Sequence, residues 1–439
     1  MRSIEMGIFG SSGVRGVVNK EMTLDLAMNI GMAVGSMAKT AVMGHDSRTA
    51  NDMMSAVASS GMMACGCEVY SAGFITTPTL AEAARCHDCG VMLTASHNPP
   101  EYAGIKLWNP DGMGFSAEQS AQIEQMIEED KYSTKPWNLV GSSHLFPDAV
   151  ETHMERVMAG VGSASLKVVV DCANGPALTI TPLVLQQMGC RVVTLNSNRD
   201  GHFSGRMPEP TDENISDLKR SVVSMKADLG IAHDGDADRM IAVDDKGVTL
   251  SGDETLALFA SRYASQRIVV SVDASMAVDD TVDVEVVRTR VGDVFVSEEV
   301  KRTEADFGGE PSGTWIFPDQ TYCPDGILAA ARIVEIASSE KLSKVRESIP
   351  RYPTLRAAFE YDLKSRDEIL DRLRDEMTAI DCDELLTLDG YRLLFEDGWT
   401  LVRPSGTEPK IRVVAEARRA ERAEELLTMI SDKVKGCLK

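Results

Sequence analysis

The feature that most constrains this chain is a pattern that occurs three times along it. Each copy has an apolar strand, then an aspartate, a helical stretch and a second short strand. The first strands cover residues 40–44, 166–170 and 268–272, and the aspartates that follow are Asp46, Asp171 and Asp273. Parallel strands joined by helices form sheets that are covered on both faces. The repeat therefore predicts three α/β domains of similar topology.

The last part of the chain has a different pattern. From about residue 352 it contains an extended segment, an amphipathic helix over 365–377, strands around 391–402 and a final helix over 419–435. This order is typical of an α+β domain. We therefore expect four domains, with boundaries at 1–148, 149–252, 253–350 and 351–439.

Composition restricts the classes of partner. The net charge of −22 over 439 residues argues against nucleic acid and against an anionic membrane surface. The nine cysteines are scattered along the chain, no segment is apolar and long enough to span a membrane, and the N-terminus has no signal-peptide pattern. We expect a cytoplasmic protein that binds a small molecule, as a monomer or homodimer. An anionic substrate would need locally concentrated arginines.

A serine follows the buried strand predicted over residues 90–93. Residues 94–99 read Thr-Ala-Ser-His-Asn-Pro, which places the Ser96 hydroxyl in a turn stiffened by prolines. The Gly-x-Ser-x-Gly elbow of serine hydrolases is absent. Lys106 lies on a strand that could return to the same sheet edge and exchange a proton with a hydroxyl. Taken singly, a turn-forming serine and a solvated lysine are the alternatives.

Three carboxylates follow the next strand of this kind, over residues 227–232. Asp234, Asp236 and Asp238 occupy every second position of a tight loop that ends at Arg239. Such oxygen ligands suit Mg²⁺, which keeps few protein ligands and adds phosphate oxygens. A calcium hand needs glycine where Arg239 stands and a helix where the strand is predicted. A solvated acidic turn is the other alternative.

Two further loops carry polar groups. Residues 307–313 are glycine-rich, which lets a ligand approach the backbone, and Glu310 and Ser312 could bind sugar hydroxyls. Residues 9–16 form a second glycine-rich loop, which could place Arg15 near a reacting phosphate. Structural turns are the alternative for both.

The fourth loop, residues 403–412, predicts a phosphate site. Hydroxyls, backbone N–H groups around a glycine and two arginines form a nest for a dianion. The residues concerned are Arg403, Ser405, Gly406, Thr407 and Arg412.

Together these loops resemble the α-D-phosphohexomutase superfamily, and the resemblance covers the whole chain in order. It implies three similar α/β domains and a C-terminal α+β domain around a central cleft. It further implies phosphorylation of Ser96, a Mg²⁺ site made by Ser96 and the three aspartates, sugar binding by Arg239, Glu310 and Ser312, and distal phosphate binding by the fourth loop. Arg15, His97 and Lys106 fall where the superfamily has supporting or acid–base residues, and we take Lys106 as the base.

The implied reaction moves a phosphoryl group between O6 and O1 of a hexose phosphate through a hexose 1,6-bisphosphate. Thr314 stands where many members have histidine, and this loop resembles archaeal members described as phosphoglucosamine mutases or phosphomannomutases. We therefore expect a phosphoglucosamine mutase. A phosphomannomutase or phosphoglucomutase is the alternative within the superfamily, and a sugar-phosphate phosphatase or a non-catalytic sensor is the alternative outside it.

Overall fold

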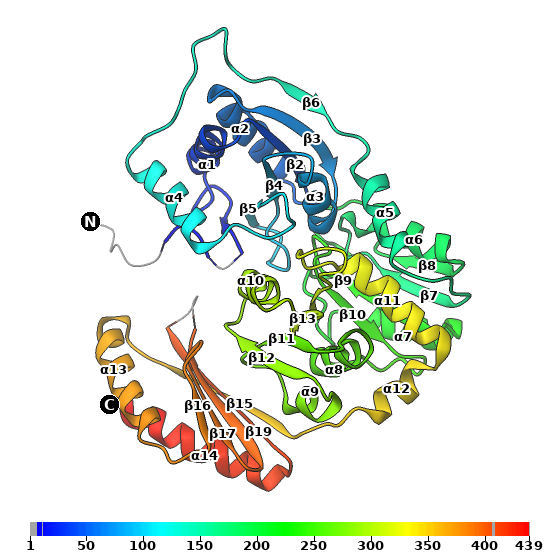
Figure 1. Ribbon diagram of the computed structural model, residues 1–439, viewed down its shortest axis with the longest axis vertical. Helices are drawn as coiled ribbons and strands as arrows, with labels where there is room; N and C mark the ends of the chain where they lie inside the picture. Colours follow the sequence, from blue (N-terminus) through cyan, green and yellow to red (C-terminus); the bar gives the residue numbers. More distant parts are fainter. Residues whose placement is uncertain (1–6, 11, 406–408, 439) are drawn as a thin grey trace.

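The computed structural model describes residues 7–10, 12–405 and 409–438. Figure 1 shows four domains arranged in an arc, with the first and the fourth on either side of its open side. Each domain has one sheet of its own. The predicted architecture of three α/β domains and one α+β domain is confirmed.

The three α/β sheets share one arrangement of four strands. In the first domain the order is β5 (Tyr102–Trp108), β4 (Cys89–Leu93), β2 (Thr40–His45), β3 (Glu68–Phe74), with β1 (Val14–Val17) and β6 (Ser143–Leu145) added at the edges. The second has β10 (Met240–Val243), β9 (Leu229–His233), β7 (Lys167–Asp171), β8 (Arg191–Leu195), and the third has β14 (Thr314–Ile316), β13 (Phe307–Glu310), β11 (Arg267–Ser271), β12 (Glu285–Thr289). In each sheet the first-named strand of these four runs antiparallel to its neighbour, and the other neighbouring strands run parallel.

The helices cover the sheets as the repeat predicts. The first domain contains α1 (Leu24–Met37), α2 (Asn51–Ala64), α3 (Thr77–Ala84) and α4 (Ala117–Glu128). The next segment contains α5 (Ala149–Ala159), η1 (Pro176–Thr179), α6 (Thr181–Met188) and α7 (Ser216–Met225). The third contains α8 (Gly252–Tyr263), α9 (Met276–Thr281), α10 (Asp293–Thr303), α11 (Gly326–Ser339) and α12 (Leu342–Ser348).

The shared topology fixes where the sequence motifs lie. In each α/β domain a short loop joins the antiparallel strand to the strand before it in sequence, that is, β4 to β5, β9 to β10 and β13 to β14. The strands β4, β9 and β13 are buried along their whole length, and polar side chains stand at their ends and in the loops that follow. The serine, aspartate and glutamate–serine motifs lie at these three equivalent loops, with Glu310 as the last residue of β13.

The fourth domain is an antiparallel sheet with two helices packed against it. The strand order is β15 (Thr354–Glu360), β19 (Lys410–Ala417), β18 (Gly398–Pro404), β17 (Tyr391–Phe395), β16 (Glu384–Leu386). The helices are α13 (Arg366–Thr378), which follows η2 (Leu363–Ser365), and α14 (Ala420–Cys437). Ile369 and Leu373 from α13 and Ile430 from α14 are buried in one core with Val402 and Val413 of the sheet.

The second and third domains do not have separate cores. The largest hydrophobic cluster joins Val168 and Ile231 of the second sheet to Ile333 of α11 and Phe307 of the third sheet. Figure 1 shows α11 beside the strands of the second domain, although it follows the third sheet in sequence. The second and third domains are therefore held together by shared burial of apolar side chains.

Two expectations from the sequence concern the state of the cysteines and the presence of membrane-spanning segments. All nine cysteines are free thiols, and seven of them are buried. Among the described residues, no helix has the length and apolar character needed to cross a membrane.

Candidate active site

The loop between β4 and β5 presents Ser96 to residues 234–239 of the next domain, the candidate metal loop. Ser96 has a left-handed backbone, with φ of 49°, an uncommon conformation for a residue other than glycine. Its Oγ donates to Oδ2 of Asp234 at 2.7 Å and lies 3.2 Å from Nδ1 of His97. The serine and aspartate motifs, 138 residues apart in sequence, thus meet across the boundary between two domains.

The close approach of these two turns requires a glycine. A Cβ on Gly235 would lie 2.5 Å from the carbonyl oxygen of Ser96, which is closer than atoms can pack. Thr77, at the start of α3, adds two contacts from the first domain. Its Oγ1 donates to Oδ2 of Asp236 at 2.6 Å, and its N–H donates to the Asp236 carbonyl at 3.0 Å.

Arg48 holds the serine turn in place. The guanidinium is buried and donates to the carbonyl oxygens of four residues of this turn, at distances of 2.6 to 2.9 Å. These acceptors belong to Ser96, Asn98, Pro99 and Tyr102. Asp46, at the end of β2, pairs with Arg48 Nε at 3.2 Å and so fixes the guanidinium.

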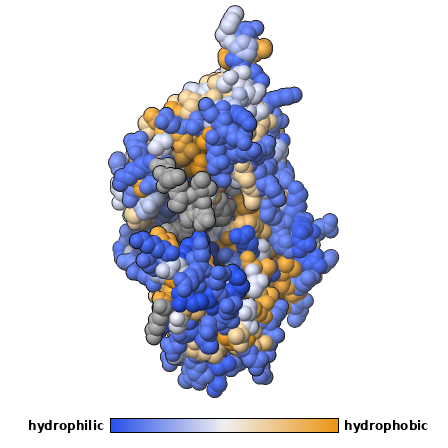
Figure 2. All heavy atoms as spheres, turned by 90° about the vertical axis from the view of Figure 1, so that its left-hand side faces the viewer, coloured by the Kyte–Doolittle hydropathy of each residue, from blue (hydrophilic) through white to orange (hydrophobic). Residues whose placement is uncertain are grey.

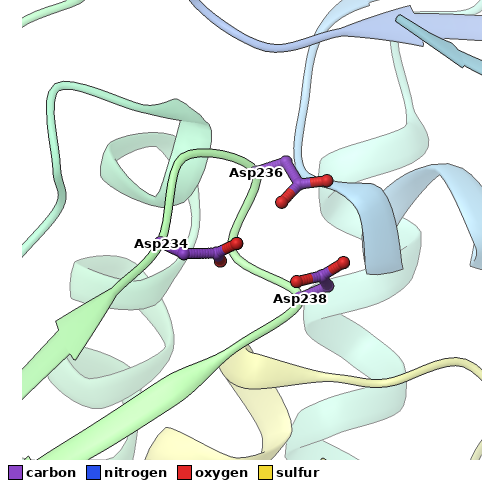
Figure 3. Close-up of side chains that lie close together, drawn as sticks. All are labelled: Asp234, Asp236 and Asp238. Atoms are coloured by element: carbon purple, nitrogen blue, oxygen red, sulfur yellow. The ribbon is translucent and has the colours of Figure 1, made fainter. Parts of the chain in front are cut away.

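Figure 3 shows Asp234, Asp236 and Asp238 directing their carboxylates toward a common point. One oxygen from each lies within 4.8 Å of the others. All three residues are buried, and Oδ1 of Asp236 and Oδ1 of Asp238 have no hydrogen-bond partner among the described residues. Buried carboxylate oxygens without donors are costly unless a cation binds them. A set made only of carboxylates fits a hard divalent cation such as Mg²⁺.

The protonation of this triad reflects burial first and the crowding of like charges second. Burial raises the pKa of Asp234 well above its ordinary value, and the charges of Asp238 and Asp236 raise it further. Burial opposes ionisation of Asp236 as well, but Lys106 and Thr77 hold its pKa below the usual range. A bound cation would let all three carboxylates ionise together.

Lys106 lies on β5, opposite Met92 of β4, as expected from a strand that returns to the same edge. Its Nζ is 3.0 Å from Oδ2 of Asp236 and 2.6 Å from Oδ2 of Asp238. Burial acts to lower the pKa of Lys106, but these two carboxylates raise it above its ordinary value. In this arrangement the amine is an ammonium ion.

Arg15 and His97, which are also expected beside Ser96, lie near it in the structure. Nη1 of Arg15, on β1, donates to Oδ1 of Asn98 at 3.1 Å. Burial and then the charges of Arg239 and Arg15 lower the pKa of His97 to about 2, so its imidazole is neutral. Cationic groups therefore concentrate around Ser96, although the chain as a whole has a net charge of −22.

Residues 307–314, the candidate sugar loop, face the same region from the third domain. Glu310 is buried, and its Oε1 accepts a hydrogen bond from Gly292 N at 2.7 Å. Burial, followed by the charges of Asp273 and Asp293, raises the pKa of Glu310 to about 8. Arg239 pairs with Thr314 through a β-bridge, which ties the metal loop to the sugar loop. Ser312 Oγ lies 3.1 Å from Thr314 Oγ1.

The phosphate loop lies on the fourth domain, at the end of β18 and the start of β19. Arg403, Ser405 and Arg412 line a cleft of about 680 Å³ where the first, third and fourth domains meet. Gly406 and Thr407 lie outside the described residues. A smaller pocket lined by Lys106 shares Phe9, Gly10 and Phe115 with this cleft. Adjoining cavities thus lead from Lys106 toward Arg403.

Sequence reasoning did not identify the buried arginines that shape the loops. Arg206 repeats the role of Arg48 in the second domain: its Nε donates to Asp171 at 2.8 Å, and its other nitrogens donate to the carbonyls of Met207, Pro208 and His233. The signal was available in the repeat, because Asp46 and Asp171 hold the equivalent position after the first strand. Their arginine partners lie 2 and 35 residues away, a spacing that no motif defines.

Comparison with known proteins supports one family along the whole chain. The sequence matches the profiles of phosphoglucomutase/phosphomannomutase α/β/α domain I over residues 6–134, domain II over 148–247, domain III over 251–352 and the C-terminal domain over 358–433. A probable phosphoglucosamine mutase from Methanosarcina barkeri is 51% identical over 99% of this chain and 100% of its own length. One from Methanopyrus kandleri is 45% identical over 98% of each chain.

Solved structures show the same architecture. A phosphoglucomutase/phosphomannomutase family protein from Burkholderia thailandensis superposes with a TM-score of 0.86 at 28% identity, covering 98% of this chain and 97% of that one. An Aspergillus fumigatus N-acetylphosphoglucosamine mutase, solved with GlcNAc-6P and magnesium, has a TM-score of 0.60 at 17% identity, covering 98% and 96%. At that identity the second likeness bears on the fold alone.

Proposed function

The chain belongs to the phosphoglucomutase/phosphomannomutase family, and from this premise we propose that it interconverts glucosamine 6-phosphate and glucosamine 1-phosphate. The observation that carries the proposal is the contact between Ser96 Oγ and Asp234, in a site that adjoins the cleft lined by Arg403. A hydroxyl beside a carboxylate triad suits phosphoryl transfer, and arginines at the far end of the cavities suit a second phosphate.

Ser96 carries the phosphoryl group in this proposal. The bond between phosphorus and Ser96 Oγ breaks as a bond forms from phosphorus to the free O1 or O6 of the sugar monophosphate. The resulting hexose 1,6-bisphosphate reorients in the cleft. Its other phosphoryl group then returns to Ser96 Oγ, which leaves the isomeric monophosphate. Arg15 and Arg239 lie where they would offset negative charge during each transfer.

The residues present fit Mg²⁺ at the triad. Asp234, Asp236 and Asp238 would hold it, together with the oxygen on Ser96, and the unpartnered Oδ1 atoms of Asp236 and Asp238 support this assignment. When bound, the cation would neutralise carboxylate charge and stabilise charge on the phosphoryl oxygens.

Lys106 is our candidate for proton transfer with the sugar hydroxyl. As an ammonium ion, Lys106 can only donate a proton. To accept the proton of the sugar hydroxyl it must first become a neutral amine, which requires that its pKa fall. Its pKa is held up by Asp236 and Asp238. Weakening either pairing favours the neutral amine, which can take the hydroxyl proton during attack on phosphorus. His97 stays neutral and lies where it orients the Ser96 oxygen.

The fourth domain binds the phosphate that is not reacting. Arg403, Ser405, Gly406, Thr407 and Arg412 supply this subsite in our proposal. The placement of the three described members along one cleft supports it. The same loop meets a phosphate in both reaction directions, because the sugar presents either O1 or O6 to Ser96.

The glucosamine assignment rests on two supports. Relatives at 45% and 51% identity over nearly the whole chain are described as probable phosphoglucosamine mutases. Glu310 and Ser312 lie in the sugar loop, and an ammonium group beside Glu310 would favour its ionised carboxylate.

Nine free thiols also support a reducing compartment, the cytoplasm.

The test compares kcat/KM for the 6-phosphates of glucosamine, mannose and glucose, with a trace of the matching bisphosphate present. We expect glucosamine 6-phosphate to be preferred and Ser96→Ala to abolish turnover while the protein stays folded. A preference for mannose or glucose would make the protein a phosphomannomutase or phosphoglucomutase. Release of inorganic phosphate in place of the isomer would identify a phosphatase, and no turnover at all would identify a sensor.

A further inference from the structure

One wall of the cleft beside the phosphate loop is formed by residues that lie outside the sequence motifs. Arg290 and Val291, which follow β12 in the third domain, line it together with Arg403, Ser405 and Arg412 of the fourth. Figure 2 looks onto this side of the molecule, where hydrophilic residues cover most of the surface. A ligand in the cleft would therefore meet cationic side chains from two domains.

Arg290 is an exposed cation held in a fixed orientation. Its guanidinium lies over the ring of Phe295, 4.4 Å from the centroid, and in the described part of the chain it has no carboxylate partner. Its neighbour Arg288 is different, because it is paired with Asp279 at 2.6 Å. Stacking leaves the edge of a guanidinium free to bind an anion.

The position beside Arg403 and the Val291 N–H is occupied by an anionic group, the carboxylate of Asp389. Its Oδ2 forms an ion pair with Arg403 Nε at 2.9 Å and accepts a hydrogen bond from the backbone N–H of Val291 at 3.3 Å. One carboxylate oxygen thus joins the fourth domain to the residue next to Arg290. Glu124, the other carboxylate among the described residues that line the cleft, already accepts a hydrogen bond from the N–H of Phe9 at 2.7 Å.

We propose that the distal phosphate subsite extends into the third domain, where Arg290 and the Val291 N–H bind the phosphate, and that Asp389 fills this position until a phosphate displaces it. This inference rests on the proposed function, because it assigns further residues to that site. The exchange is favourable on charge grounds. Asp389 offers one negative charge in a partly exposed pair, which contributes little, whereas a dianion would bind Arg403 and Arg290 together.

The test measures equilibrium binding of glucosamine 6-phosphate to the dephosphorylated protein by calorimetry at fixed ionic strength. We expect Arg290→Ala to raise Kd by about tenfold, as for loss of one charge-assisted contact. We expect Asp389→Asn to lower Kd, because it removes the internal competitor. Arg302→Ala is the matched control: it removes the same charge from an exposed side chain of α10, paired with Glu299.

The outcomes separate this inference from the function on which it rests. If the wild type binds none of the 6-phosphates of glucosamine, mannose and glucose, the proposed function fails. If the wild type binds one of them and Arg290→Ala has the same Kd as Arg302→Ala, the assignment of Arg290 is overturned. An unchanged or higher Kd in Asp389→Asn would overturn the proposal that Asp389 fills the phosphate position in the absence of a ligand.

Discussion

At the scale of single residues, the ammonium group of Lys106 compensates the negative charge of the acidic triad when no divalent cation is bound. Its ammonium lies within 3.0 Å of Asp236 and Asp238, in a site where all three side chains are at most 8% exposed. Removing one member of a buried ion pair leaves uncompensated charge, which costs about 3–5 kcal/mol. We therefore expect Lys106→Met to lower the melting temperature markedly when no divalent cation is present.

The same variant tests the metal assignment. Mg²⁺ should raise the melting temperature of Lys106→Met by more than that of the wild type, because the cation then binds carboxylates that have no competing ammonium. Lys344→Met, which alters an exposed lysine of α12, should melt like the wild type with or without Mg²⁺. Equal Mg²⁺ responses in all three proteins would contradict cation binding at the triad.

Glu310 predicts a pH dependence of stability. Its pKa of about 8 in the fold lies above the ordinary value of about 4.3 for an unfolded chain. Between these values the folded protein retains a proton that the unfolded chain has released, so stability falls as pH rises, by at most about 1.4 kcal/mol per pH unit. Glu310→Gln lacks this titration, and its free energy of unfolding should fall less than that of the wild type between pH 5 and 8.

Chemical denaturation at several pH values would measure this difference. Glu128→Gln, at the end of α4, changes an exposed glutamate and should follow the wild-type curve. Parallel curves for the wild type and Glu310→Gln would show that the carboxyl ionises in the fold as easily as in water.

At the scale of elements, the serine and aspartate loops each have a buried arginine behind them, Arg48 and Arg206. Arg48 reaches four carbonyl oxygens and Asp46 at once, which the planar guanidinium allows and the single nitrogen of lysine does not. We expect Arg48→Lys to destabilise the protein by about 3 kcal/mol, because buried carbonyl oxygens lose their donors, and to lower kcat more than it changes KM, because the serine is displaced while the distal subsite is intact.

Steady-state kinetics and denaturation of the same preparation would test this expectation. Arg220→Lys provides the control, since Arg220 lies on the surface of α7 and pairs with Asp217. A kcat equal to that of the control would mean that the Ser96 turn keeps its shape without Arg48.

The sequence predicted the elements and motifs that depend on local pattern. The buried strands β4 and β9, the turns after them and the threefold repeat follow from apolar runs and polar turn residues. The clamps made by Arg48 and Arg206 could not be predicted, because their acceptors are backbone carbonyls that any residue supplies. The place of α11 against the second sheet could not be predicted either, since an apolar helix face does not specify which sheet covers it.

At the scale of the whole molecule, the described residues of the fourth domain are anchored on the third domain. Arg392 is buried and donates to the carbonyls of Val272 and Ala274, and Glu416 accepts from Ser275 and Met276, all four in the third domain. On its other side the cleft separates the phosphate loop from the first domain. The anchored side can act as the pivot of a closing motion.

A bisphosphate in the cleft would join both sides and draw the domains together. We expect small-angle X-ray scattering to show a smaller radius of gyration for Ser96→Ala when glucose 1,6-bisphosphate is added, since this variant can bind the ligand but cannot exchange a phosphoryl group with it. Adding Arg403→Ala removes the contact from the fourth domain, so the double variant should stay open at the same ligand concentration. Adding Arg302→Ala should leave the contraction unchanged. A radius that did not respond to ligand in Ser96→Ala, at a concentration where calorimetry shows binding, would mean that the fourth domain binds phosphate without moving.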